Sequence, residues 1–448
     1  MHGEQALLIP REIDTTMTEP TPCSPKPVSP AYAHYVLALL TLVYVFNFID
    51  RQILSMLIEP IKQEFGVSDT AMGLLTGFTF VVFYTLAGIP IARWADRSSR
   101  KFIIALSLTI WSAMTAACGM ARNFTELSLL RVLVGVGEAG GNPPAHSLIA
   151  DYFPPSKRAT ALSIYAWGVY IGAAIAFLAG GYLVSHYSWR MAFLVVGLPG
   201  ILLAVLVALT VREVPRGLSE HRTHEIREEA VPLKEVIRYL LGRRAFVFIA
   251  LGASVQSLSG YGVLTWGPTF LSRVHHMPWT EIGVSMGWII GLAGCFGAYF
   301  GGRLADRMGT RDARWYMRLP ALQSALAIPF VVGFTLIPDQ SLALLCFIPF
   351  YALGAMYVGP MFSMVQGLVQ LRMRATASAI LLFVVNMVGL GLGPLTVGLL
   401  NDYYFGAMHG PLAIRYSMLV VGLLGGMASL LFWQAARTLK EDLANSKG

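Results

Sequence analysis

The sequence predicts an all-α membrane protein with twelve transmembrane helices in two pseudo-symmetric six-helix bundles, and three observations predict this class. Of its 448 residues, 55% are apolar and only 13% are charged, about half the charged fraction of a soluble domain. Apolar stretches of spanning length recur along the whole chain, and two short motifs repeat at matching places in its halves. A mean hydropathy of +0.61 agrees with this class.

The apolar stretches define the predicted helices, because a helix that crosses a bilayer needs about 20 mostly apolar residues. Six stretches precede the polar segment 212–243, and six follow it. The predicted spans are 34–57, 71–92, 102–120, 125–149, 159–185, 190–211, 245–271, 280–302, 317–337, 341–368, 376–400 and 413–435.

Basic residues predict how these helices are oriented. With the N-terminus inside, the inner segments hold 26 of the 33 Lys and Arg residues. The outer segments hold five: Lys62, Arg122, Arg190, Arg273 and Arg415. Cytosolic loops are enriched in Lys and Arg, so we expect both termini to lie in the cytosol.

The polar segments divide the chain into five regions. A proline-rich tail at 1–33 is predicted to be disordered. Bundles at 34–211 and 245–437 are joined by a cytosolic linker at 212–244, and a cytosolic tail occupies 438–448. Within the linker, apolar residues repeat at helical spacing from Leu233 to Leu241, with charges between them. This pattern predicts an amphipathic helix, either on the inner membrane surface or packed on the base of the bundle.

Two motifs support the division into halves. Ala-Asp-Arg occurs at 95–97 and again at 305–307, and Arg-Ala-Thr-Ala occurs at 158–161 and again at 374–377. Each pair occupies matching places relative to the predicted helices. Parallel repeats of this kind are related by an axis along the membrane normal and enclose a central pathway.

Four charged residues lie inside the predicted spans, where charges are costly and usually functional. At 1.5 Å per residue, Asp50 and Arg131 lie at similar depth, in the outer third, and are predicted to pair. Glu138 follows Arg131 by seven residues, too far along the helix for a direct pair, and lies near the bilayer centre. Arg51 has no assigned partner and either snorkels outward or contacts substrate.

This arrangement predicts proton coupling through Asp50, Arg131 and Glu138. Protonation of Asp50 would release Arg131 to hold an anionic headgroup, and Glu138 would carry the proton. The alternative is that the four charges form a fixed structural network. A set of polar and aromatic residues is predicted to line the pathway with Arg51, although each can also serve packing alone. The set is Asn47, Phe48, Tyr84, Asn142, Tyr165, Tyr170, Gln256 and Asn386.

The duplicated Asp-Arg loop resembles that of the major facilitator superfamily, in which Gly-x-x-x-Asp-Arg/Lys-x-Gly-x-Arg/Lys-Arg/Lys joins helices 2 and 3. In the first copy Ala92 and Ser99 replace the two glycines, whereas the second keeps Gly302 and Gly309. The resemblance implies the major facilitator fold and a cytosolic gate that latches one half to the other. The matching residues are Asp96, Arg97, Arg100, Lys101, Asp306 and Arg307.

The first half also resembles the spinster family, chiefly over residues 35–200. The matching motifs are Phe-Ile-Asp-Arg at 48–51, Gly-Leu-Leu at 73–75 and Val-Gly-Val-Gly-Glu-Ala at 134–139. The resemblance implies a bacterial inner-membrane transporter of an amphiphilic anion such as a lysolipid or a sphingosine-phosphate-like molecule. In exporters of this superfamily helix 5 carries Gly-Pro-x-x-Gly-Gly, and here only Gly180 and Gly181 match. The direction of transport therefore stays open.

Other classes are disfavoured by what the sequence lacks. It contains no HExxH or GxxxxGK[ST] motif, which argues against metalloprotease and ATP-driven functions. We expect no cofactor, no metal, no nucleic-acid partner and a monomeric state. An organic-anion or multidrug carrier without a lipid role is the alternative within the same class. A non-transporting receptor or scaffold is the alternative from a different class.

Overall fold

The computed structural model describes residues 29–216, 218, 231–370 and 373–444, and in these residues every regular element is a helix. The all-α prediction is therefore confirmed. The predictions for most of the tail 1–33, for linker residues 219–230 and for the last four residues fall outside the described part of the chain.

The first half contains eight α-helices and one π-helical segment. They are α1 (Pro30–Phe65), α2 (Asp69–Gly73), η1 (Leu74–Phe78), α3 (Thr79–Arg97), α4 (Arg100–Cys118), α5 (Phe124–Glu138), α6 (Asn142–Tyr152), α7 (Pro155–His186) and α8 (Trp189–Thr210). Segments α2, η1 and α3 follow one another directly and occupy one predicted span. Helix α1 continues past the predicted end at residue 57 and stops at Gly66, whose φ of +64° is the left-handed conformation that glycine adopts at a helix C-cap.

The second half repeats this pattern with more interruptions. A short helix, α9 (Leu233–Leu241), precedes it. Its elements are α10 (Arg244–His275), α11 (Trp279–Trp288), η3 (Ile289–Ala293), α12 (Gly294–Gly309), α13 (Trp315–Leu336), α14 (Gln340–Ala355), α15 (Val358–Gly367), α16 (Arg374–Asn386), η5 (Met387–Leu392), α17 (Gly393–Leu399), η6 (Leu400–Phe405), α18 (Gly406–His409), η7 (Gly410–Leu412) and α19 (Ala413–Ala444).

These helices account for the predicted spans. Ten segments of the described chain are long and apolar enough to cross a membrane. The last of them, Thr376–Ala444, contains the two predicted spans 376–400 and 413–435, and Gly410 lies between them. The predicted span 125–149 is broken into α5 and α6. Each predicted range thus corresponds to one helix or to a run of consecutive helices.

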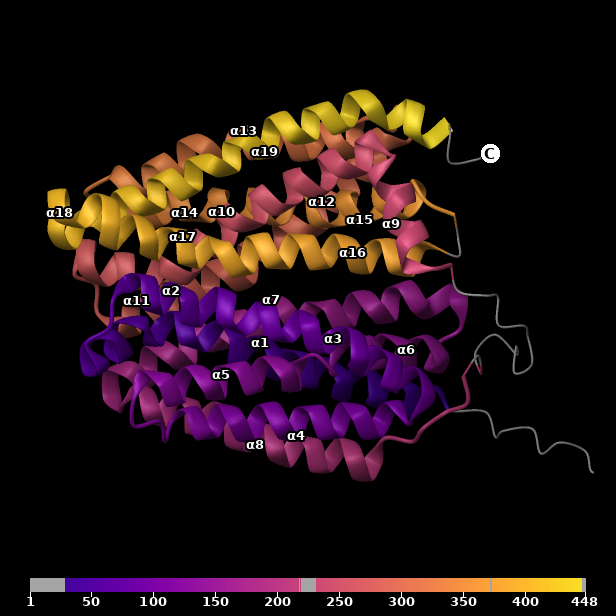
Figure 1. Cartoon of the computed structure of the whole chain (residues 1–448), viewed down its shortest axis with the longest axis horizontal. Helices are drawn as coiled ribbons and strands as arrows, with labels where there is room; N and C mark the ends of the chain where they lie inside the picture. The colour runs from indigo at the N-terminus through magenta and orange to yellow at the C-terminus, as the bar shows by residue number, and fades with distance from the viewer. Residues whose placement is uncertain (1–28, 217, 219–230, 371–372, 445–448) are drawn as a thin grey trace, which may run out of the picture.

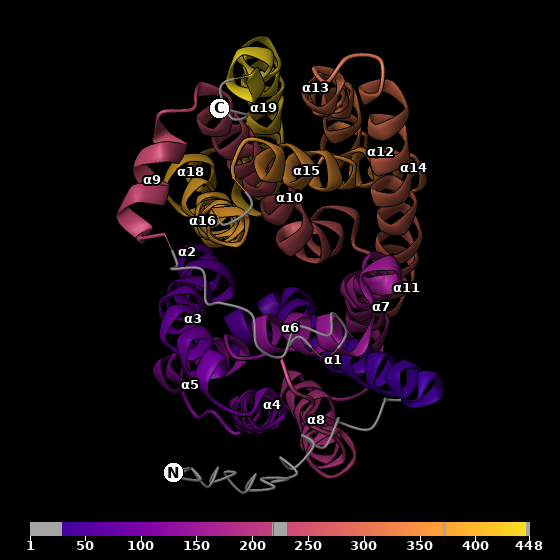
Figure 2. The same ribbon diagram turned by 90° about the vertical axis from the view of Figure 1, so that its right-hand side faces the viewer.

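The two halves lie side by side with their helices roughly parallel (Figure 1). We call the end that carries α9 the linker end, and the end that carries α11 and α18 the far end. Figure 2 looks onto the linker end and shows the first half and the second half as separate groups of helices.

The apolar core explains how the halves are joined. Buried residues of both halves, such as Leu54 in α1 and Phe270 in α10, belong to one continuous cluster. A second cluster, which includes Phe246 and Phe432, contains residues of α9 and the second half alone. The halves therefore share a core at the far end and have separate cores at the linker end.

Close glycine contacts also join the halves at the far end. A Cβ added at Gly181 in α7 would lie 2.5 Å from the Trp279 carbonyl oxygen and 2.8 Å from Cα of Gly283 in α11. At Gly73 in α2, an added Cβ would lie 2.6 Å from the Pro394 carbonyl oxygen. Only glycine permits such close backbone approach, so Gly181 serves packing between the halves.

Candidate functional site

An ion pair between Arg51 and Glu138 forms the centre of the candidate site. Arg51 Nε donates to Glu138 Oε2 at 2.6 Å, and the two side chains are 11% and 0% exposed. The expectation that Glu138 stands alone is wrong, and so is outward snorkelling of Arg51; the alternative, that Arg51 contacts substrate, stays a prediction. Arg51 turns inward from α1, and Glu138 is its partner.

A break in the helix places Glu138. It is the last residue of α5, and residues 139–141 form a turn before α6 begins at Asn142. Gly140 and Gly141 weaken the helix, and Pro143 and Pro144 begin α6 without backbone N–H donors. Non-helical backbone at this depth is tolerated where it is buried in protein or lines a cavity.

Asp50 and Arg131 do not form the predicted ion pair. Asp50 instead accepts a hydrogen bond of 2.6 Å from the Thr115 hydroxyl of α4, although it lies near enough to Arg131 to interact electrostatically. Similar depth does not fix the direction of a side chain around the helix axis. Asp50 faces α4, and the guanidinium of Arg131 points elsewhere.

Arg131 is a buried cation without hydrogen bonds at two of its nitrogens. The side chain is almost completely buried, and Nε and Nη1 have no hydrogen-bond partner in the described part of the chain. Its guanidinium lies 5.5 Å from the centre of the Phe80 ring, which gives it a cation–π contact. An unpaired buried cation is costly, so Arg131 has unused capacity to hold an anion.

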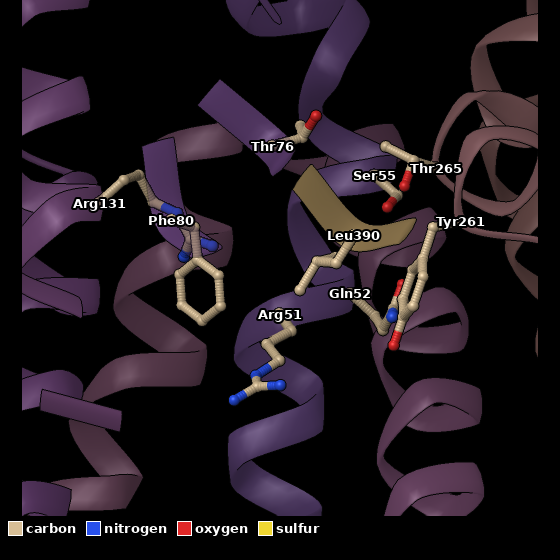
Figure 3. A pocket seen from close by; sticks show the side chains of 9 residues that line it. All are labelled: Arg51, Gln52, Ser55, Thr76, Phe80, Arg131, Tyr261, Thr265 and Leu390. Carbon is tan, nitrogen blue, oxygen red and sulfur yellow. The ribbon is translucent and has the colours of Figure 1, made fainter. Parts of the chain in front are cut away.

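Aromatic rings surround Arg51 on several sides. Its guanidinium carbon lies 5.5, 5.1 and 4.6 Å from the ring centres of Phe48, Phe80 and Tyr84. Phe80 therefore contacts both arginines, and Figure 3 shows its ring between the two guanidinium groups. Sequence reasoning missed Phe80, because one aromatic residue in an apolar helix gives no distinct signal.

A small pocket beside these arginines is lined by residues of both halves. Its volume is about 10 Å³, the space of one water molecule. Both arginines are on its wall (Figure 3). The other lining residues are Gln52, Ser55, Thr76 and Phe80 from the first half and Tyr261, Thr265 and Leu390 from the second.

The remaining predicted lining residues divide into groups. Tyr165 donates a 2.6 Å hydrogen bond to Asn142 Oδ1 and stacks on Tyr44, with ring centres 4.5 Å apart. Tyr170 of α7 contacts the second half, where an added Cβ at Gly294 would lie 2.5 Å from its ring.

The other three lie on α1 and in the second half. Asn47 is buried on α1, one turn before Arg51. Gln256 accepts a 2.8 Å hydrogen bond from Ser324 within the second half. Asn386 ends α16, and no described contact connects it with the arginines.

A charge cluster at the far end was not predicted. Arg273 at the end of α10 binds Asp69 through two nitrogens at 2.7 and 2.9 Å and reaches Glu59 at 2.6 Å. Lys62 also binds Asp69, at 2.6 Å. Asp402 accepts the backbone N–H of Thr70 at 2.6 Å. We call these residues the far-end cluster; they fasten the first half to the second.

The sequence profile of the Major Facilitator Superfamily matches residues 40–394. The chain belongs to this superfamily. A relative described as an MFS-type efflux pump, from Mycolicibacterium smegmatis, is 32% identical over 92% of this chain and 95% of its own length. A Bacillus subtilis relative described as a hexuronate transporter is 25% identical over 86% of this chain and 93% of its own.

A solved structure relates the chain to the spinster transporters. It is described as a bacterial homologue of the human lysosomal transporter spinster in an inward-facing, unoccupied conformation. It is 34% identical, covers 93% of this chain and 99% of that chain, and superposes with a TM-score of 0.84. The predicted resemblance to this part of the Major Facilitator Superfamily is therefore confirmed.

Among the described side chains of the superfamily's loop motif, none forms a hydrogen bond or ion pair across the halves in this conformation. Arg100 is buried, pairs with Asp151, and donates to Glu213 and the Val214 carbonyl at 2.8 and 2.6 Å. All three partners belong to the first half or to its exit into the linker. In this conformation the partners of Arg100 therefore lie within its own bundle, and a latch between the halves stays a prediction.

The other predicted gate residues behave similarly where they are described. Asp306 accepts a 2.9 Å hydrogen bond from Tyr316 within the second half. The Lys101 backbone N–H donates to Glu213 at 2.9 Å. Within the described residues, Arg97 and Arg307 make no side-chain hydrogen bond or ion pair across the halves, and the Asp96 side chain lies outside the description.

Proposed function

We propose that the chain is a proton-coupled secondary transporter that moves an amphiphilic anion, of the lysolipid or sphingosine-phosphate type, by alternating access. One observation carries the proposal. Arg131 is a buried guanidinium with two unpartnered nitrogens, and it lies on a pocket between the two halves. An arginine guanidinium without a partner can donate two parallel hydrogen bonds to a carboxylate or a phosphate.

Proton coupling is assigned to the carboxyl groups beside that guanidinium. Protonation of Glu138 removes its charge and breaks the ion pair with Arg51, so the guanidinium of Arg51, which already lines the pocket, is free to join Arg131 in holding the anion. Asp50, held by Thr115, is the second proton site and adjusts the charge next to Arg131. Loss of either proton restores negative charge close to the arginines and favours release.

Alternating access is assigned to the two ends of the bundle. Breaking the far-end cluster would open the pocket toward the far end. The separate cores at the linker end agree with the inward-facing conformation of the spinster homologue. Because the Lys and Arg residues concentrate at the linker end, we assign that end and both termini to the cytosol of a bacterial cell. A single chain holds the whole pathway, so we propose a monomer.

The proton test uses reconstituted vesicles with an imposed pH gradient. We expect Glu138→Gln and Asp50→Asn each to lose most gradient-driven transport, because neither side chain can then release a proton. Glu281→Gln, at an exposed acidic residue of α11, serves as the matched control, and we expect its transport to keep its dependence on the pH gradient. Full gradient dependence in both variants would refute proton coupling through these residues.

The substrate test measures binding of a lysolipid panel to the purified protein. Arg131→Ala is expected to weaken binding of anionic lysolipids about 10- to 100-fold, the value of a charge-assisted hydrogen bond pair. Arg122→Ala, at an exposed arginine of the far end, is the control and leaves binding unchanged. Tighter binding of compact organic acids, such as hexuronates, than of any lysolipid would reject the lipid assignment.

A further inference from the structure

Helix α9 has one apolar stripe that is buried against the second half. Val236 and Leu240 are fully buried and pack into the core formed with α10 and α19. Tyr239 donates a hydrogen bond of 3.4 Å to the Leu368 carbonyl. Both views show α9 running across the spanning helices at the linker end, at the edge of the second half (Figures 1 and 2).

A second apolar stripe of α9 has no cover from the described residues. Leu233, Ile237 and Leu241 are 50, 39 and 66% exposed. Spaced four residues apart, they lie in one row on the helix. At 100° per residue this row adjoins the buried stripe, and together they form an apolar arc of about 140°. The packing on the bundle base therefore accounts for half of the apolar face.

The position of α9 sets what can cover the exposed stripe. The membrane-spanning helix α10 begins at Arg244, three residues after α9 ends at Leu241. Such a short connection holds α9 at the level where α10 enters the bilayer. A helix that crosses the spanning helices there lies in the plane of the membrane surface.

The charges of α9 indicate which lipid headgroups its exposed face would complement. Lys234 and Arg238 are exposed and lie next to the exposed apolar row. In the described chain no acidic side chain pairs with either of them. Exposed Arg244 follows, and Glu235 is the only acidic residue on the helix. Positive charge beside an apolar row complements anionic lipid headgroups.

We propose that α9 is an anionic-lipid anchor of the second half. Leu233, Ile237 and Leu241 insert between the acyl chains of the adjacent leaflet. Lys234 and Arg238 contact anionic phosphate headgroups such as those of phosphatidylglycerol. Because the buried stripe and Tyr239 bind α9 to the second half alone, the leaflet holds that half and not the first.

The test measures the membrane depth of a spin label at Leu241→Cys in the full-length protein, after its four native cysteines are replaced by alanine. The label's accessibility to oxygen and to a water-soluble nickel complex is compared in neutral phosphatidylcholine vesicles and in vesicles with about 30% phosphatidylglycerol. We expect immersion in the anionic vesicles, and a shift toward water when salt reaches about 1 M, where the Debye length is only about 3 Å.

Charge variants separate lipid binding from simple burial. Lys234→Gln with Arg238→Gln should weaken the anionic-lipid dependence roughly 30-fold, because each basic residue near an anionic surface contributes a factor of about five. Lys234→Arg with Arg238→Lys should retain it. As a matched control, Arg311→Gln with Arg437→Gln removes two exposed charges elsewhere at this end and should leave the label immersed. A label that stays in water in every vesicle, or that ignores the lipid charge, overturns the proposal.

Discussion

Arg273 in the far-end cluster gives a prediction whose size follows from the structure. It forms a bidentate ion pair with Asp69 and a further ion pair with Glu59. The side chains of Arg273, Asp69 and Glu59 are 14, 5 and 16% exposed, respectively. Removing one partner of such a largely buried pair costs about 3 kcal/mol. The cost falls on the conformation in which the far end is closed. Arg273→Gln should therefore shift the equilibrium toward far-end opening by roughly 150-fold.

The assay is a distance measurement between spin labels on the two halves. Labels at Thr125 and Ser341, exposed residues near the far end of each half, report on opening by double electron–electron resonance. Arg273→Gln should populate longer distances than the parent protein. Arg190→Gln is the control, because Arg190 pairs with Glu64 at 2.6 Å within the first half. An unchanged distance distribution for Arg273→Gln would show that the cluster does not hold the far end closed.

Three further predictions test other contacts. Gly181→Val should also lengthen the far-end distances, since overpacking costs about 1–3 kcal/mol; unchanged distances would contradict tight packing there. Thr115→Val should lower the unfolding temperature in detergent more than Thr109→Val, because Thr109 bonds only within α4 while Thr115 bonds a buried carboxyl; equal shifts would contradict this. Burial raises the pKa of Glu213, but hydrogen bonds from a backbone N–H of α4 and from Arg100 outweigh it and hold that pKa below its usual range. The ionised Glu213 therefore stabilises the fold above the unfolded pKa of about 4.3, and this stabilisation is lost as the pH falls through the lower folded pKa. Between about pH 7 and pH 3, the unfolding temperature of Glu213→Gln should therefore drop less than that of the parent protein; an equal drop would contradict this.

The helices and the site charges could be predicted because both depend on local sequence. Spanning length and apolar content located each helix, and the cost of buried charge directed attention to the four intramembrane residues. Their partners could not be predicted. Rise per residue fixes depth, but pairing depends on direction around each helix axis and on the break after Glu138. The structure therefore replaced an Asp50–Arg131 pair with an Arg51–Glu138 pair.

The far-end cluster was missed for a different reason. Lys62 and Arg273 were recognised only as two of the few basic residues on the predicted outer side. Their acidic partners lie near helix ends, where charges are common and carry no signal of their own. The contact between Arg273 and Asp69 joins residues 204 positions apart, and no local pattern encodes such a distance. Glu59, a charged residue within the extended α1, was the available hint.

The Phe80 ring, which lies against both arginines, connects the two events that we propose for the site, protonation of a carboxyl group and binding of an anion. Its electron-rich faces stabilise positive charge on either guanidinium, so a movement of one changes the surroundings of the other. Thermodynamic reciprocity then applies: if protonation changes anion affinity by some factor, the anion changes proton affinity by the same factor. Titrating the protein with ligand in weakly buffered solution should therefore release or take up protons, even with transport stopped. Replacing Phe80 by leucine should reduce that proton signal while both charges stay in place.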